Sequence, residues 1–113
     1  MRAKGNAKTK AALAELQAGL KKIYGSNAPL LLVYGSYARQ EAHSDSDIDV
    51  LLVYSSEIRP GEEIHRVSAI LADLNLRYQV LVSVLPASEH KYRSSKSGFW
   101  ENIRREGKPI DAL

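Results

Sequence analysis

The 113-residue chain contains no cysteine, so it can form neither disulfide bonds nor thiolate metal sites. Long hydrophobic runs are also missing, and no apolar stretch approaches the roughly 20 residues of a membrane-spanning helix. The N-terminal stretch MRAKGNAKTKAALAELQ is basic but lacks the uninterrupted apolar segment of a signal peptide. These absences are consistent with a cytosolic protein that has no membrane segment.

Neither positively nor negatively charged residues are in large excess. The formal net charge is +3, and 44% of the residues are hydrophobic and 26% charged, which is typical of one globular domain. We therefore expect residues 1–113 to form a single domain. The mild positive surplus suits an anionic ligand or nucleic acid, but a solvated surface explains it equally well and is the favoured interpretation.

Apolar periodicity predicts a small α/β (α+β) domain with helices flanking a mixed sheet. Helical spacing covers residues 7–23 and 60–77, and a further helix is predicted over 97–105. Short apolar runs predict strands over residues 30–34, 47–54 and 78–85, the last stopped by Pro86, with a possible edge strand at 108–110. Ser36 is the predicted N-cap of a short helix over 37–41, and a polar loop follows at 42–46.

Two aspartates begin the predicted strand 47–54. Side chains of a strand alternate between its faces, so Asp47 and Asp49 share one face and can converge on a metal ion. Two solvated loop carboxylates would be the usual interpretation of such a pair. Here the apolar run follows without a turn residue, which favours a site. A calcium-binding EF-hand loop is rejected because Val50 and Ser56 occupy the positions that require glycine and glutamate.

A glycine–serine pair ends the predicted strand 30–34. Such a junction exposes free backbone N–H groups and the positive end of a helix, which favour phosphate. Gly35 would allow close approach, the Ser36 hydroxyl could donate to a phosphate oxygen, and Arg39 could reach the same phosphate chain. Alone, each feature is more often a turn or a surface residue. Together with Asp47 and Asp49 they indicate one site that holds phosphate and a metal ion.

The stretch GSYARQEAHSDSDIDVLLV resembles the signature of the DNA polymerase beta-like nucleotidyltransferases, and is especially similar to their minimal (MNT-type) members. The ending FWENIRREGKPI also resembles the end of these small domains. The resemblance implies a nucleotidyltransferase-like fold in which Gly35 and Ser36 hold the triphosphate. It also implies that Asp47 and Asp49 bind magnesium at a two-ion site and are the catalytic residues.

The resemblance implies transfer of a nucleoside monophosphate, AMP if ATP is the donor, to an acceptor hydroxyl. Active members usually carry a third carboxylate on the next strand, but RYQVLVSVLP contains none, and Leu81 or Gln79 aligns with the position. The second magnesium ion therefore lacks its usual ligand. A catalytically degenerate nucleotide-binding or toxin-neutralising module is the alternative.

The resemblance also suggests a partner. MNT-type proteins pair as antitoxins with HEPN-domain toxins, so a HEPN-domain protein is the expected partner. A homodimer is a further option, because small sheets with exposed edges often dimerise. The acceptor could be a protein hydroxyl, a small molecule or a nucleic acid end.

Overall fold

The computed structural model describes residues 2–42 and 47–113, with only the backbone described for residues 2–6. Most of the predicted loop 42–46 therefore lies outside the described residues. In order, the elements are α1 (Arg2–Tyr24), a 3-10 turn η1 (Gly25–Asn27), β1 (Leu30–Tyr34), α2 (Gly35–Ala38), β2 (Ile48–Tyr54), α3 (Pro60–Tyr78), β3 (Val82–Ser88), α4 (Glu89–Ser94), α5 (Gly98–Glu106) and a 3-10 turn η2 (Ile110–Ala112). The predicted mixed α+β architecture is confirmed.

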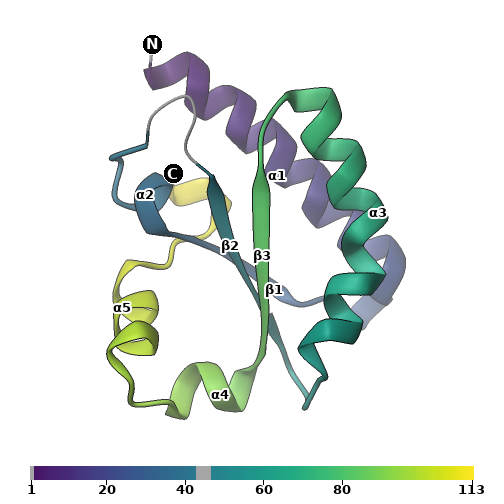
Figure 1. Cartoon of the computed structure of the whole chain (residues 1–113), viewed down its shortest axis with the longest axis vertical. Helices are drawn as coiled ribbons and strands as arrows, with labels where there is room; N and C mark the ends of the chain where they lie inside the picture. The colour runs from purple at the N-terminus through teal and green to yellow at the C-terminus, as the bar shows by residue number, and fades with distance from the viewer. Residues whose placement is uncertain (1, 43–46) are drawn as a thin grey trace.

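The sheet has three strands in the order β1-β2-β3. The central strand β2 runs antiparallel to β1 and parallel to β3, so the sheet is mixed. Figure 1 shows α1 and α3 on one side of this sheet and α2, α4 and α5 on the other. The molecule therefore has three layers, with β2 in the middle of the middle layer.

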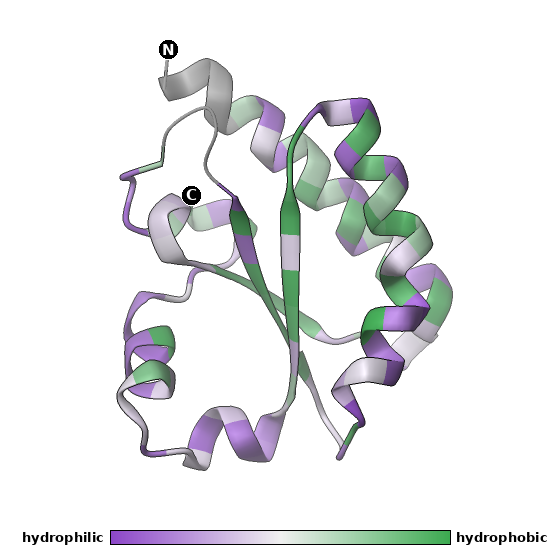
Figure 2. Cartoon of the chain, in the orientation of Figure 1, coloured by the Kyte–Doolittle hydropathy of each residue, from purple (hydrophilic) through white to green (hydrophobic). Residues whose placement is uncertain are grey.

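Strand alternation divides the core in two. One face of β2 sends Ile48, Val50 and Leu52 into the cluster formed with α1 and α3, where Leu13, Leu16 and Leu74 are also buried. The other face sends Leu51 and Val53 against Trp100 and Ile103 of α5. Figure 2 shows the strands coloured hydrophobic along most of their length, as expected for a sheet covered on both faces. Asp49 lies on the same face of β2 as Leu51 and Val53, as strand alternation predicts, and this is the face that α5 covers.

Strand β3 differs from the prediction in position and length. It was predicted over residues 78–85, but α3 continues to Tyr78 and β3 occupies Val82–Ser88. Pro86 lies inside the strand and does not stop it. This is allowed because β3 is an edge strand whose odd-numbered residues bond to β2, so the missing N–H of Pro86 faces outward.

The chain after α5 does not form the predicted edge strand at 108–110. Lys108 instead makes a single antiparallel bridge with Val33 of β1, and η2 follows directly. Extending this antiparallel ladder would require Ile110 as the next hydrogen-bonded residue, but Ile110 begins η2 and its carbonyl accepts from the N–H of Leu113 at 3.1 Å. Among the described residues, no helix has the length and apolar character that crossing a membrane requires.

Candidate active site

The turn between β1 and α2 requires glycine for two reasons. Gly35 has a φ of +74°, in the left-handed region that residues with side chains rarely adopt. A Cβ atom at this position would also lie 2.4 Å from Oδ2 of Asp49. The turn therefore brings bare backbone against a carboxylate of the neighbouring strand.

The prediction that Ser36 is the N-cap of α2 was wrong. The helix begins at Gly35, two residues earlier than predicted, so Tyr34 is the N-cap and Ser36 lies in the first turn. The carbonyl of Ser36 accepts a hydrogen bond from the N–H of Glu41 at 2.8 Å, and that of Gly35 accepts from Arg39 at 3.1 Å. The N–H groups of a first helical turn have no acceptor within the helix, so this turn can receive an anion.

Asp47 and Asp49 differ in their surroundings. Asp47 is exposed just before β2, whereas Asp49 is partly buried within it. Burial raises the pKa of Asp49, the negative charge of Asp47 raises it further, and the positive charge of Arg39 lowers it. The two carboxylates repel each other beside bare backbone. A cation bound next to them would offset this repulsion.

Ser83, and neither Leu81 nor Gln79, occupies the position next to Asp49 on β3. The register pairs Asp49 with Tyr34 on one side and with Ser83 on the other. Gln79 instead caps α3 with a φ of 53°, and Leu81 precedes the strand. Within the described ranges 2–42 and 47–113, no group of three or more His, Cys, Asp or Glu side chains is arranged to hold a metal ion.

The acidic residues that follow β2 lie at its other end. Glu63 is buried and accepts a hydrogen bond from the hydroxyl of Tyr24 at 2.7 Å, and that hydroxyl is 3.0 Å from the hydroxyl of Tyr54. Tyr54 is the last residue of β2, whereas Asp49 is its second. Glu57 and Glu62 line a surface hollow together with Glu63. These glutamates therefore cannot supply a third carboxylate beside Asp47 and Asp49.

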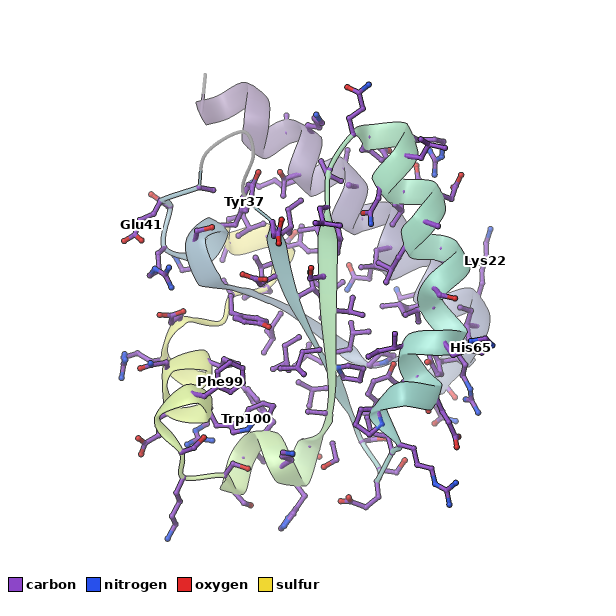
Figure 3. All side chains as sticks on the ribbon, in the orientation of Figure 1. Lys22, Tyr37, Glu41, His65, Phe99 and Trp100 are labelled. Atoms are coloured by element: carbon purple, nitrogen blue, oxygen red, sulfur yellow. The ribbon has the colours of Figure 1, made fainter. Side chains whose placement is uncertain are left out.

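Arg39 lies beside the turn and pairs with two carboxylates. Its Nε donates to Glu41 at 3.0 Å and its Nη1 donates to Glu106 of α5 at 3.2 Å. In Figure 3, Glu41 points outward beyond α2, whereas Phe99 and Trp100 project from α5 toward the sheet. The contact with Glu106 was not foreseen, because nothing in the sequence relates residues 67 positions apart.

Comparisons with known proteins agree with this geometry. A model of the family "Polymerase beta, Nucleotidyltransferase" matches residues 19–110, which include both halves of the site. The fold and the site thus define a nucleotidyltransferase domain. The chain belongs to the polymerase beta nucleotidyltransferase family.

One curated relative covers nearly the whole chain. It is named "Putative protein adenylyltransferase MJ0604", from Methanocaldococcus jannaschii, and is 28% identical over 100 residues, which are 88% of this chain and 94% of the relative.

Two solved structures share the fold. A toxin–antitoxin structure with AMP-PNP superposes with a TM-score of 0.56 at 16% identity, over 91% of this chain and 71% of that chain. A crystal structure described as "a putative nucleotidyltransferase from Sulfolobus solfataricus" gives a TM-score of 0.56 at 20% identity, over 84% of this chain and 77% of that chain.

Proposed function

We propose that this protein is an adenylyltransferase that transfers AMP from ATP to an acceptor hydroxyl, with Gly35, Ser36 and Arg39 binding the nucleotide and Asp47 and Asp49 as catalytic residues. The observation that carries the proposal is the contact between the Gly35 backbone and the Asp49 carboxylate. This contact supports a single site made of the turn at Gly35–Ser36 and the carboxylates of Asp47 and Asp49. The name of the M. jannaschii relative supports AMP as the transferred group and a protein as acceptor.

The donor set suits magnesium. Mg²⁺ prefers hard oxygen ligands and is commonly held by one or two carboxylates together with substrate phosphates. Asp47 and Asp49 supply such carboxylates, and burial and the charge of Asp47, which raise the pKa of Asp49, favour a cation beside it. When bound, Mg²⁺ would offset the charge of these carboxylates and of the triphosphate. The carboxylates present suit one ion better than two, because Ser83 stands beside Asp49.

The residues of the site would orient the reactants. The first-turn N–H groups at Gly35 and Ser36 and the guanidinium of Arg39 would hold the phosphate chain by positioning and charge, which are the main requirements of phosphoryl transfer. The acceptor oxygen then forms a bond to the α-phosphorus as the bond to pyrophosphate breaks. The hydroxyl proton leaves to solvent or to a group carried by the acceptor, because Ser83 is not a carboxylate.

We also propose that residues 1–113 act as one domain and that a partner protein supplies the acceptor. The toxin–antitoxin neighbour supports a toxin as that partner, and the resemblance to MNT-type proteins suggests a HEPN-domain toxin. A direct test incubates the protein with Mg²⁺ and labelled ATP, with and without this partner. Transfer of label that is lost in Asp47→Asn and Asp49→Asn supports the proposal.

A nucleotide-binding module without turnover is the second candidate. The serine at position 83 favours it, since this is where the register would place a third acid. Magnesium-dependent ATP binding with no transfer to the partner, to itself or to RNA would select this module. Failure to bind ATP would contradict both candidates.

A further inference from the structure

Arg39 is held by two carboxylates that differ in how firmly they are placed. Glu41 lies two residues along the same loop, and its side chain is 64% exposed. Glu106 is the last residue of α5, and its side chain is 22% exposed. Both of its carboxylate oxygens lie within hydrogen-bonding distance of Nη1 of Arg39, at 3.2 and 3.3 Å. Glu106 is therefore the partner that ties Arg39 to a distant element.

The position of Glu106 is fixed by β1, the strand that leads into the proposed phosphate-binding turn at Gly35–Ser36. Two residues after Glu106, Lys108 exchanges two backbone hydrogen bonds with Val33, at 2.7 and 2.8 Å. Val33 is two residues before Gly35. The end of α5 and the start of the turn are thus held together by backbone bonds, which do not depend on any exposed side chain.

The connection between these bonds is short and tightly packed. The N–H of Gly107 donates to the carbonyl of Ile103 at 2.7 Å. A Cβ atom at position 107 would lie 2.9 Å from that same carbonyl oxygen and 3.7 Å from a methyl group of Leu32. The end of α5 therefore lies close to Leu32 of β1, and this proximity together with the Lys108–Val33 bonds restricts the Glu106 backbone.

We propose that Glu106 is a positioning residue that holds the guanidinium of Arg39 in place for the phosphate chain of the nucleotide. The inference rests on the proposed function, because it assigns to Glu106 a role in ATP binding. A free arginine side chain loses considerable rotamer entropy when it is immobilised on a ligand. A contact that immobilises it beforehand reduces this loss and so tightens binding.

The opposite expectation is that Glu106 competes with phosphate for the guanidinium of Arg39 and so weakens nucleotide binding. A guanidinium is a planar fork with five N–H donors, so a carboxylate on one edge does not prevent a phosphate from meeting another. The backbone N–H of Arg39 donates to the carbonyl of Gly35 at 3.1 Å, so Arg39 stays attached to the turn at Gly35 while its side chain is paired with Glu106. The pairing therefore holds Arg39 at the site and does not withdraw it.

A double-mutant cycle on ATP binding tests the role of Glu106. Binding of ATP and of adenosine, each with Mg²⁺, is measured by titration calorimetry for wild type, Glu106→Ala, Arg39→Ala and the double variant. Glu106→Ala should weaken ATP binding by about two- to fivefold, the range expected for an exposed ion pair. Adenosine binding should stay unchanged, since adenosine has no phosphate. The double variant should bind ATP no more weakly than Arg39→Ala alone.

The matched control is Glu41→Ala, which removes the other carboxylate. It should change ATP binding by less than about twofold, because Glu41 is exposed and anchors Arg39 to nothing else. Tighter ATP binding by Glu106→Ala, additive losses in the double variant, or an equal loss for adenosine would each overturn the positioning role while the proposed function stands. A wild-type protein that binds no ATP would overturn both.

Discussion

Gly35 and Asp49 are in such close contact that no side chain fits between them. The position that a Cβ atom would take at residue 35 is 2.4 Å from Oδ2 of Asp49. The two residues lie 14 positions apart in the sequence, but the pairing of Tyr34 with Asp49 brings them together where β1 ends and β2 begins. Glycine at position 35 is therefore favoured both by the positive φ of the turn and by the space that the Asp49 carboxylate occupies.

Gly35→Ala should disable the site and destabilise the fold. The new methyl group must displace Asp49, and the positive φ adds strain that costs about 1–3 kcal/mol. We expect a free energy of unfolding lower by about this amount in denaturant titrations, together with loss of magnesium-dependent ATP binding.

Gly61→Ala is the matched control for that substitution. Gly61 lies in the first turn of α3, and nothing is within 4 Å of the position its Cβ would take. The variant should be more stable by about 0.4–1 kcal/mol and should bind ATP normally. Equal stability of Gly35→Ala and wild type would show that the turn is more adaptable than the contact implies.

Asp49→Asn should stabilise the protein while abolishing transfer. A carboxyl whose pKa is higher in the folded than in the unfolded state binds its proton more tightly when folded. Its ionisation therefore lowers stability as pH rises from the ordinary value of 3.8 through the raised value. Asparagine removes this effect, so the variant should have the higher denaturant midpoint at pH 7, and the difference should shrink below pH 3.8.

Magnesium should reverse that order. It should raise the midpoint of wild type at pH 7 and leave Asp49→Asn nearly unchanged, because a ligand that binds only the folded state stabilises it. An Asp49→Asn variant less stable than wild type at pH 7 without metal would mean that the carboxylate makes a favourable contact in the fold.

Both halves of the candidate site have local signals in the sequence, and the structure brings these two segments together. Glycine at a strand end and two aspartates before an apolar run each have a direct physical meaning. Strand alternation then placed Asp49 on the correct face of β2, with Leu51 and Val53. The pairing of β1 with β2 turned two local patterns into one site.

The register of β3 could not be predicted in the same way. Helix α3 ends at a C-cap residue, Gln79, that adopts a left-handed conformation without being glycine, so the usual stop signal is missing. The side chain of Asn75 accepts a hydrogen bond from the N–H of Val82 at 3.0 Å and so marks where the strand begins. That contact depends on tertiary structure, and the prediction was wrong by four residues at the start of the strand.

Tyr24→Phe should destabilise the protein without affecting the site. The Tyr24 hydroxyl donates to the buried carboxylate of Glu63 at 2.7 Å, so its loss leaves an acceptor short of a donor. We expect a cost of about 1–3 kcal/mol in the free energy of unfolding. ATP binding should not change, because this cluster lies at the far end of β2 from Asp49.

Tyr78→Phe provides a comparison in which the same hydroxyl group is lost from a solvated contact. The Tyr78 hydroxyl donates to Glu15 at 2.8 Å, where water can replace it. Its loss should cost less than about 0.5 kcal/mol. A similar cost for both variants would indicate that burial of Glu63 does not strengthen its hydrogen bond.

Ser83→Asp should supply the third carboxylate that the site lacks. Because Ser83 pairs with Asp49 in the register, an aspartate there would face the same site. Without metal, the added charge should lower the melting temperature by repulsion, and Mg²⁺ should restore it, with magnesium affinity raised about tenfold by the extra ligand charge. Ser94→Asp is the control, since Ser94 is the exposed last residue of α4, which follows the opposite end of β3, and it should raise magnesium affinity little. If Ser94→Asp raised magnesium affinity as much as Ser83→Asp, the gain would come from added charge in general and not from a ligand beside Asp49. If Ser83→Asp also gained label transfer from ATP that wild type lacks, the natural chain would be the binding module.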